Sequence, residues 1–257
     1  MICGCSFCHE KSTIEGKHGD LNNPIIDTFS PYTEVAIGGG NPLSHPQLED
    51  FLMRLKSLKC FPSMTVNQKH FLDEYERLVR LRDSKMIYGL GISISNMTKD
   101  LADKIIEFPN AVCHVIAGIT TLEQLKQMSE FGIKKVLILG YKIFGRGEQF
   151  YNDQILDNIV ELRSHMKEVQ TLFEVLSFDN RAIKQLDVES LMTEEKWNEF
   201  YMGDDGIGDA LTSASMFIDL VERKYAKNSC SMDRYELKDT VEEMFDHLKK
   251  TVAQKEV

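Results

Sequence analysis

The sequence predicts an α/β protein with a parallel sheet, because apolar runs of strand length alternate with amphipathic stretches of helical length. Five such runs recur at intervals of roughly 25 residues, the period of β/α units joined by right-handed crossovers. The run at 136–139 is Val-Leu-Ile-Leu, apolar at every position, which is typical of a strand covered on both faces.

Each expected strand leads into a loop and then a helix. The first strand, 34–37, is followed by the glycine loop 38–42 and by a stretch whose one helical face carries Leu48, Phe51, Leu52, Leu55 and Leu58. The other units are expected at strand 63–66 with helix 69–82, strand 87–94 with helix 98–107, strand 112–117 with helix 121–131, and strand 135–139.

Beyond residue 150 the alternation becomes less regular. We expect a helix at 152–168, a sixth strand at 172–176, short helices at 181–191 and 193–202, an acidic loop at 203–209, and helices at 210–225 and 236–251. No stretch has the composition of an interdomain linker. The prediction is therefore a core at residues 1–145 and a mainly helical C-terminal extension at residues 146–257 that continues the same domain.

Composition and charge disfavour several classes of protein. The 257 residues are 42% hydrophobic and 27% charged, the proportions of an ordinary globular domain. With 30 basic and 40 acidic residues the formal net charge is −10, which repels nucleic acid and anionic membranes. The sequence has no signal-peptide pattern and no apolar stretch of membrane-spanning length, so we expect a cytoplasmic protein that binds neither nucleic acid nor membrane.

Three of the six cysteines, Cys3, Cys5 and Cys8, fall within the first ten residues. Cysteines that only fill space in a core do not need this density, although that interpretation stays open. In a reducing compartment, clustered thiols more often bind metals or take part in redox chemistry than form disulfides. The cluster therefore predicts a metal site. The remaining cysteines are scattered, and we expect a structural role for Cys60, Cys113 and Cys230.

Small, hydroxyl and amide side chains recur where the expected strands end. In a parallel β/α array these carboxyl ends form the ligand-binding edge. The loops there carry Gly38-Gly39-Gly40-Asn41, Asn67-Gln68, Ser93-Ile94-Ser95-Asn96, Gly118-Ile119-Thr120-Thr121 and Gly140-Tyr141. Each of these also suits an ordinary turn. Their coincidence at successive strand ends predicts a site for a ligand with amino, carboxylate and ribose groups.

These motifs, in this order, resemble those of the radical S-adenosylmethionine enzymes over residues 1–145. Cys5-Ser6-Phe7-Cys8 matches the second half of the family's C-x3-C-x2-C signature, including the aromatic residue before the last cysteine. Gly39-Gly40-Asn41-Pro42 is similar to the family's Gly-Gly-Glu-Pro loop, with Asn in place of Glu, and His45-Pro46 continues the likeness. Thr65-Val66-Asn67 is similar to the family's Thr-Thr-Asn at the next strand end.

Later strand ends extend the resemblance. Ile116 and Gly118 fit part of the family's G-x-I-x-G-x-x-E pattern, from which His114 and Thr121 depart. The resemblance implies cofactor contacts at Phe7, Gly39, Gly40, Asn41, Pro42, Asn67, Ser93, Ser95, Ile116, Gly118, Leu139 and Tyr141. Within this set, the two serines would meet the ribose or the methionine carboxylate, and the last two residues would hold the adenine.

The resemblance implies a partial (β/α)6-type TIM barrel that holds a [4Fe–4S] cluster and S-adenosyl-L-methionine. Cys5, Cys8 and Cys3 would be the metal ligands. The enzyme would generate a 5′-deoxyadenosyl radical that abstracts hydrogen from an unknown substrate, with a flavodoxin or ferredoxin as the low-potential electron donor. Asn41 would bind the cofactor's ammonium group more weakly than Glu, because its amide oxygen carries no charge. No catalytic side chain is assigned.

The first residues depart from the family. Counted back from Cys5, the first signature cysteine falls on Met1, and the strand that should precede the loop is absent. Three explanations stay open: an N-terminally truncated copy, which we favour, a rearranged cluster that uses Cys3, and a degenerate protein without a cluster.

Two other kinds of site compete with this interpretation. Zinc held by Cys5, Cys8 and His9, together with Cys3 or His18, would make the protein a non-catalytic binding module, although no second C-x-x-C supplies a distant ligand pair. A thioredoxin-like role for the C-x-x-C is less favoured, because a helix should follow such a motif and polar residues with Gly16 follow here.

Overall fold

The structure, a computed structural model, describes residues 13, 15–201 and 215–254. By their internal contacts these residues divide into two compact units. The first contains residues 13, 15–16, 34–46 and 61–193, and the second contains residues 17–33, 47–60, 194–201 and 215–254. The expected boundary at residue 145 lies inside the first unit, within its segment 61–193. That residues 146–257 continue one domain with the core stays a prediction.

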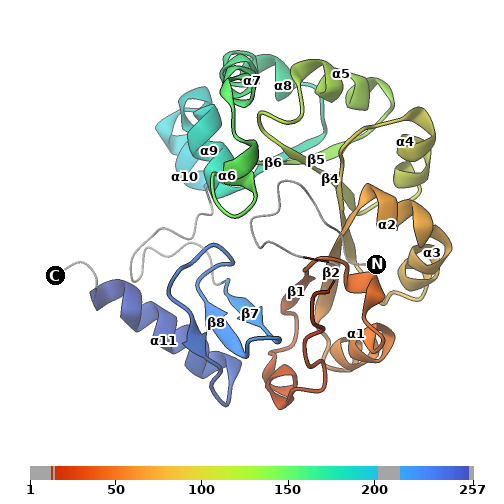
Figure 1. The fold of residues 1–257 in the computed structure, drawn as a ribbon, viewed down its shortest axis with the longest axis vertical. Helices are drawn as coiled ribbons and strands as arrows, with labels where there is room; N and C mark the ends of the chain where they lie inside the picture. Colours follow the sequence, from red (N-terminus) through yellow and green to blue (C-terminus); the bar gives the residue numbers. More distant parts are fainter. Residues whose placement is uncertain (1–12, 14, 202–214, 255–257) are drawn as a thin grey trace. The chain divides into compact units, whose positions relative to one another are not determined.

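A six-stranded parallel sheet forms the centre of the first unit (Figure 1). Its strands lie in the order of the sequence, and each is parallel to the next. They are β1 (Glu34–Ile37), β2 (Phe61–Asn67), β3 (Gly89–Ser93), β4 (Ala111–Ile116), β5 (Lys135–Leu139) and β6 (Val175–Phe178). The prediction of an α/β protein with a parallel sheet is therefore confirmed. The sixth strand begins three residues later than expected.

Helices follow one another along one side of this sheet, as Figure 1 shows for α2–α5 and α7–α9. The helices of the unit are α2 (Gln68–Asp73), α3 (Tyr75–Asp83), α4 (Lys99–Ile106), α5 (Leu122–Glu130), α6 (Gly147–Phe150), α7 (Asp153–Ser164), α8 (Met166–Val169) and α9 (Asn180–Leu186), with 3₁₀-helices η2 (Pro42–Ser44) and η3 (Val188–Leu191). The expected helices 69–82 and 152–168 are each divided in two, at Glu74 and at His165.

Side-chain caps fix where several helices begin. Thr121 and Gln124 form a capping box at the start of α5, in which each side chain accepts a hydrogen bond from the other residue's backbone N–H. Asn67, Thr98 and Asp179 cap α2, α4 and α9 with their side-chain oxygens. Because a cap directly follows β2 and β6, the chain turns from strand to helix without a long loop.

The two faces of the sheet differ in burial. Along β2, Met64 and Val66 are buried, whereas Ser63, Thr65 and Asn67 are only half-buried. The strands β4 and β5 repeat this alternation, because successive side chains of a strand point to opposite faces. The face toward the helices carries the buried residues Met64, Val66, Leu90, Ile92, Cys113, Val115, Val136 and Ilе138.

We call the opposite side of the sheet the open face. On β5 the open-face residues Leu137 and Leu139 are half-buried, whereas Val136 and Ile138 on the other face are buried. That this strand is covered on both faces stays a prediction.

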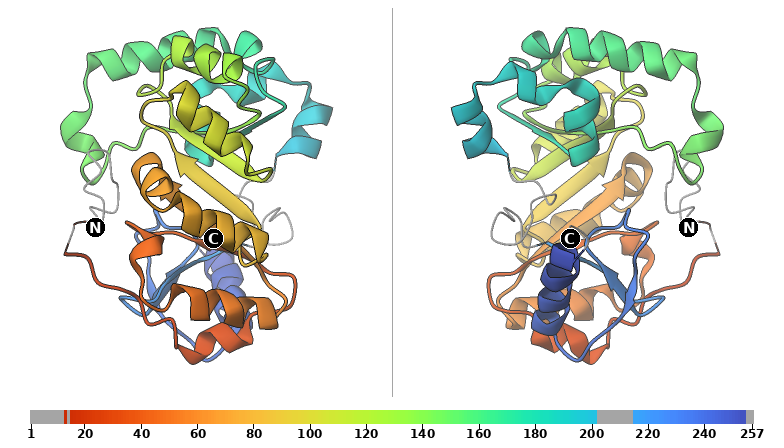
Figure 2. Two further views of the ribbon diagram at one scale, coloured as in Figure 1. Left: turned by 90° about the vertical axis from the view of Figure 1, so that its right-hand side faces the viewer. Right: turned by 90° about the vertical axis from the view of Figure 1, so that its left-hand side faces the viewer.

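The second unit contains four helices and a small antiparallel sheet. The helices are η1 (Pro24–Thr28), α1 (Leu48–Ser57), α10 (Glu194–Phe200) and α11 (Val241–Gln254), and the strands are β7 (Phe217–Asp219), β8 (Lys224–Ala226) and β9 (Tyr235–Glu236). Figure 2 shows α11 beside this sheet. The hydroxyl of the fully buried Tyr225 on β8 lies 2.6 Å from Nδ1 of His247 on α11, which joins the two elements.

This sheet corrects one prediction. The helix expected at 210–225 is not formed over the described part of that range, where β7 and the start of β8 lie instead. Helices still make up most of the regular structure in the described part of the expected extension, and the prediction missed only this small antiparallel sheet. Segments of three residues are too short for periodicity to separate strand from helix, so pairing with the next strand along the chain decides. The acidic loop expected at 203–209 lies outside the described residues.

No helix in the described part of the chain combines the length and the apolar character that crossing a membrane requires.

The burial of α5 makes a stability prediction. Leu125 is fully buried on this helix, whereas Leu156 on α7 is 46% exposed. Replacing Leu125 by Ala should lower the free energy of unfolding by about 2–5 kcal/mol, because it removes buried surface and leaves a cavity. The control Leu156→Ala should change it by less than about 0.5 kcal/mol. Urea denaturation of both variants measures the difference, and equal losses would contradict the assigned core.

Candidate functional site

Three polar side chains lie in one row across the open face of the parallel sheet. The strand register pairs Asn67 with Ser93 and Ser93 with His114. The same row continues through Leu137 to Ser177 on the next two strands. Because paired residues of neighbouring strands share a face, these side chains lie side by side near the carboxyl ends of β2, β3 and β4.

A second set of contacts confirms which residues share the open face. A Cβ placed on Gly91 would lie 2.5 Å from Cε1 and 2.7 Å from Nε2 of His114, and 2.8 Å from Oγ1 of Thr65. A Cβ on Gly89 would lie 3.0 Å from the Cβ of Ser63. The side chains of β2 and β4 therefore occupy the space that the two glycines of β3 leave open.

His114 is the only histidine of this row. Burial lowers the pKa of its imidazole from 6.5 to about 4, because a charged ring would lose hydration there. At neutral pH the ring is therefore uncharged, with one nitrogen that donates a hydrogen bond and one that accepts. Within the described residues no hydrogen bond satisfies either ring nitrogen. A polar ligand could therefore use both.

The glycine loop after β1 is open on the side where a side chain would project. A Cβ at Gly38 or Gly39 would have no atom of the described residues within 4 Å. Gly39 has φ +114°, a conformation that residues with side chains rarely adopt. Asn41 then precedes the 3₁₀-helix η2, and its carbonyl oxygen accepts hydrogen bonds from the backbone and the hydroxyl of Ser44. Gly40 and Asn41 are half-buried, and Pro42 is buried.

The loop after β3 is tied to the start of α2. The side-chain oxygen of Gln68 accepts hydrogen bonds from the backbone N–H groups of Ser95 and Asn96, at 2.8 and 3.0 Å. Asn67 uses its own side-chain oxygen to cap α2 by accepting from the N–H of His70. The amide NH2 of Asn67 remains as a donor. Ser95 is exposed, whereas Ser93 is half-buried at the end of its strand.

The ends of β4 and β5 contribute apolar and structural residues. Ile116 and Leu139 are paired across the two strands and half-buried. Gly118 has φ +86°, and a Cβ there would lie 2.8 Å from the backbone oxygen of Ile155, so close packing of α7 accounts for this glycine. Tyr141 is 1% exposed and its hydroxyl donates to the carbonyl of Gly147. The ring of Tyr141 is therefore part of the packed core.

The residues expected to hold a metal lie outside the described residues. These are Cys3, Cys5 and Cys8, and the expected cofactor contact Phe7 lies there too. Within residues 13, 15–201 and 215–254 no group of three His, Cys, Asp or Glu side chains could hold a metal ion.

The other cysteines have different surroundings. Cys60 and Cys113 are buried, as expected of structural residues. Burial raises the pKa of the Cys113 thiol to about 12, so this group is not a ready nucleophile at neutral pH. Cys230 is exposed and therefore fills no core position.

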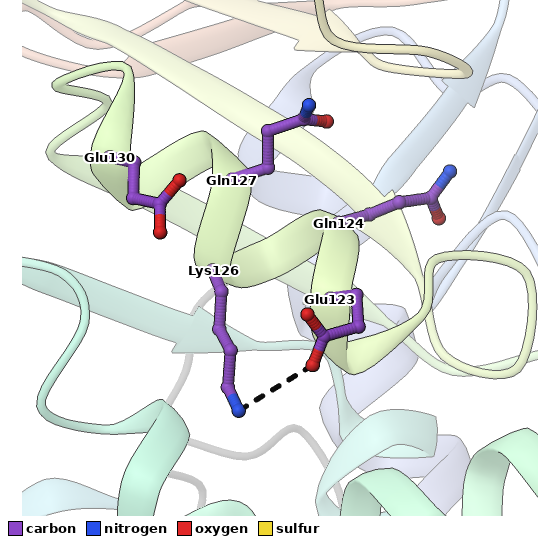
Figure 3. A pocket seen from close by; sticks show the side chains of 5 residues that line it. All are labelled: Glu123, Gln124, Lys126, Gln127 and Glu130. Atoms are coloured by element: carbon purple, nitrogen blue, oxygen red, sulfur yellow. Dashed lines mark ion pairs between the residues drawn. The ribbon is translucent and has the colours of Figure 1, made fainter.

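A surface hollow lies away from the strand ends and is not a candidate site. All of its lining residues come from α5, namely Glu123, Gln124, Lys126, Gln127 and Glu130 (Figure 3). They lie on the exposed side of that helix, opposite Leu125. The ammonium group of Lys126 lies 3.6 Å from a carboxylate oxygen of Glu123 and 2.9 Å from one of Glu168. The hollow is thus a charged, solvated helix surface.

Comparison with known proteins gives no further assignment, because no protein-family model and no curated protein matches the chain.

The structure places two pairs of the predicted strand-end residues side by side, and it adds His114, which sequence reasoning missed. Asn67 and Ser93 share the open face, and Ile116 and Leu139 pair at the ends of β4 and β5. His114 was noted only as a departure from a pattern. Its neighbours became visible only from the strand register, because the alternation within β4 does not reveal which residue of β3 lies beside it.

The close contact between Gly91 and His114 predicts strong coupling. Gly91→Ala should lower the free energy of unfolding by about 1–3 kcal/mol, because the new methyl group would overlap the imidazole. In a His114→Ala background the loss should be clearly smaller, since only Thr65 then crowds the methyl group. Denaturation of the two single variants and the double variant measures the coupling. Gly38→Ala is the matched control, with open space around its new methyl group. Equal losses in both backgrounds would contradict the contact.

The pKa of His114 makes a prediction about pH. Because folding lowers this pKa from 6.5 to about 4, the unfolded chain takes up the proton first as the pH falls. The contribution of His114 to stability is therefore complete above pH 6.5 and is lost progressively between pH 6.5 and 4. NMR titration of histidine-labelled protein should show the His114 ring still neutral at pH 5, with the signal assigned by its absence in His114→Gln. A His114 ring that is protonated at pH 6 would contradict the assigned environment.

Proposed function

We propose that the protein is an enzyme of the radical S-adenosylmethionine type, with its cofactors at the carboxyl ends of β1–β5. The observation that supports this best is the arrangement of the motif residues. Gly39 follows β1, and Asn67, Ser93, Ile116 and Leu139 end the next four strands of one parallel sheet. Motifs that are separate in the sequence thus fall on one edge of the sheet, where ligands of parallel β/α proteins bind.

Six sequential parallel strands also support the finer fold that we propose, a partial (β/α)6-type TIM barrel. The interior of a filled barrel is occupied mainly by bulky branched residues. On the open face of this sheet β2 and β3 carry Ser63, Thr65, Gly89, Gly91 and Ser93. Such small side chains leave room for a ligand.

The residues present fit S-adenosylmethionine. The open backbone at Gly38 and Gly39 allows close approach of the methionyl part. Asn41 can accept a hydrogen bond from an ammonium group through its amide oxygen, although without the charge of a carboxylate. The hydroxyl of Ser93 and the amide NH2 of Asn67 suit the ribose or the carboxylate. Ile116 and Leu139 offer apolar contact for the adenine.

The donor set of the first residues fits an iron–sulfur cluster. Thiolates are the usual ligands of such clusters, and Cys5, Cys8 and Cys3 would supply three of them. When bound together, the reduced cluster and S-adenosylmethionine supply a 5′-deoxyadenosyl radical that abstracts hydrogen from the substrate. The sheet would position the cofactor and hold the substrate on its open face, and an electron donor such as a flavodoxin or ferredoxin would be the partner.

The test of this proposal is anaerobic reconstitution of the protein with iron and sulfide. The protein should bind about four irons per chain. The electron paramagnetic resonance signal of the reduced protein should shift when S-adenosylmethionine is added. Cys8→Ala should lose the bound iron, because it removes a ligand. Cys230→Ala is the matched control, since this exposed thiol is no ligand in the proposal, and it should keep the iron.

Two results would overturn the proposal. Full iron content in Cys8→Ala would show that the ligand assignment is wrong. Zinc in the protein as isolated, with no cluster after reconstitution, would favour a binding module over an enzyme.

A further inference from the structure

The space above Gly91 on the open face is shared by two polar side chains. Atom Nε2 of His114 and atom Oγ1 of Thr65 both lie within 3 Å of the point where a Cβ of Gly91 would be. The imidazole comes from β4 and the hydroxyl from β2, and both converge because the residue between them on β3 has no side chain. This pair lies one step toward the amino ends of the strands from Ser93.

Neither polar group forms a hydrogen bond within the described residues. Within the described residues the imidazole of His114 and the hydroxyl of Thr65 have no hydrogen-bond partner, and both side chains are half-buried. Other hydroxyl groups in the same unit do bond to the backbone: Ser129 donates to the carbonyl of Leu172, and Ser44 donates to that of Asn41. Half-buried polar groups normally find a partner, so a ligand or water should satisfy this pair.

We propose that His114 and Thr65 form a substrate-recognition site that hydrogen-bonds an uncharged hydroxyl or amide group of the substrate. This inference rests on the proposed function, in which the substrate lies on the open face near S-adenosylmethionine. A neutral imidazole donates one hydrogen bond and accepts one, and a hydroxyl group can do both. A hydroxyl or amide group of a ligand has the complementary donor and acceptor.

The charges of the open face argue against an anionic group at this position. Among the strand residues on that face, the charged ones are Glu34 and Lys135, at the amino ends of β1 and β5. Glu34 accepts a hydrogen bond from the hydroxyl of Ser63, and the ammonium group of Lys135 donates to the carbonyl of Pro109. No strand residue beside His114 and Thr65 supplies a positive charge. A phosphate or carboxylate would lose its hydration there without compensation.

The test uses two pairs of small probes, each an uncharged molecule and an anionic analogue of it. Acetamide and acetate form one pair, and glycerol and glycerol phosphate form the other. Each is titrated into the full-length protein with isotope-labelled histidine, and the NMR signals of the His114 ring are followed. Acetamide and glycerol should shift these signals in a saturable way, whereas acetate and glycerol phosphate should not.

A variant tests the role of Thr65. Thr65→Val keeps the shape of the side chain and removes its hydroxyl, so it should weaken the binding of acetamide and glycerol by about threefold to tenfold. Thr171→Val is the matched control, because its hydroxyl donates to the carbonyl of Glu168 on the surface, and it should leave binding unchanged. The thermal unfolding of both variants shows that they are folded. Unchanged binding in Thr65→Val would overturn the proposal.

The outcomes separate this inference from the proposed function. If the cluster and S-adenosylmethionine bind but no uncharged probe shifts His114, the recognition site is wrong and the proposed function stands. If the charged probes shift His114 as strongly as the uncharged ones, the assigned chemistry is wrong. If the uncharged probes bind while no cluster assembles, the site is real and the proposed function fails.

Discussion

The hydrogen-bond register between β2, β3 and β4 determines which side chains share the open face of the sheet. A slip of one residue would reverse the faces of a strand, so that Met64 and Val66 would leave the core and Thr65 would enter it. Burial of each large apolar side chain contributes roughly 1.5–3 kcal/mol. Burial of the apolar face toward the helices therefore stabilises this register. The register in turn determines which polar side chains lie on the open face. Under the proposed function, stability and ligand binding thus belong to opposite sides of the same strands.

The glycines of β3 lower the stability of the strand in exchange for space on the open face. A glycine within a strand loses conformational entropy on folding and offers no side chain for packing. At Gly91 the missing side chain makes room for the imidazole of His114 and the hydroxyl of Thr65. At Gly118 the same absence serves the close approach of α7 instead. A glycine within β3 and a glycine in the loop after β4 therefore have different structural reasons, which only the surrounding atoms distinguish.

Much of the parallel unit could be predicted from the sequence, because its strands and helices have distinct periodicities and its helices begin at recognisable caps. The division of expected helices at Glu74 and His165 could not, since both segments keep an apolar helical pattern across the break. The strands β7 and β8 could not either, because three residues carry no reliable period. For the site, the strand ends predicted Asn67 and Ser93. The sequence alone could not place His114 beside Ser93, because that neighbourhood depends on the register of two strands that are separated by α4.

The central claim is that the open face, at the carboxyl ends of the parallel strands, holds the cofactor. A crystal structure of the anaerobically reconstituted protein with S-adenosylmethionine tests it most directly. The account predicts cofactor density beside Gly39, Ser93 and Ile116, with the thiolates of Cys5 and Cys8 on the cluster. Cofactor bound on the helix side of the sheet, or a metal held by the cysteines with the strand ends occupied only by water, would contradict it.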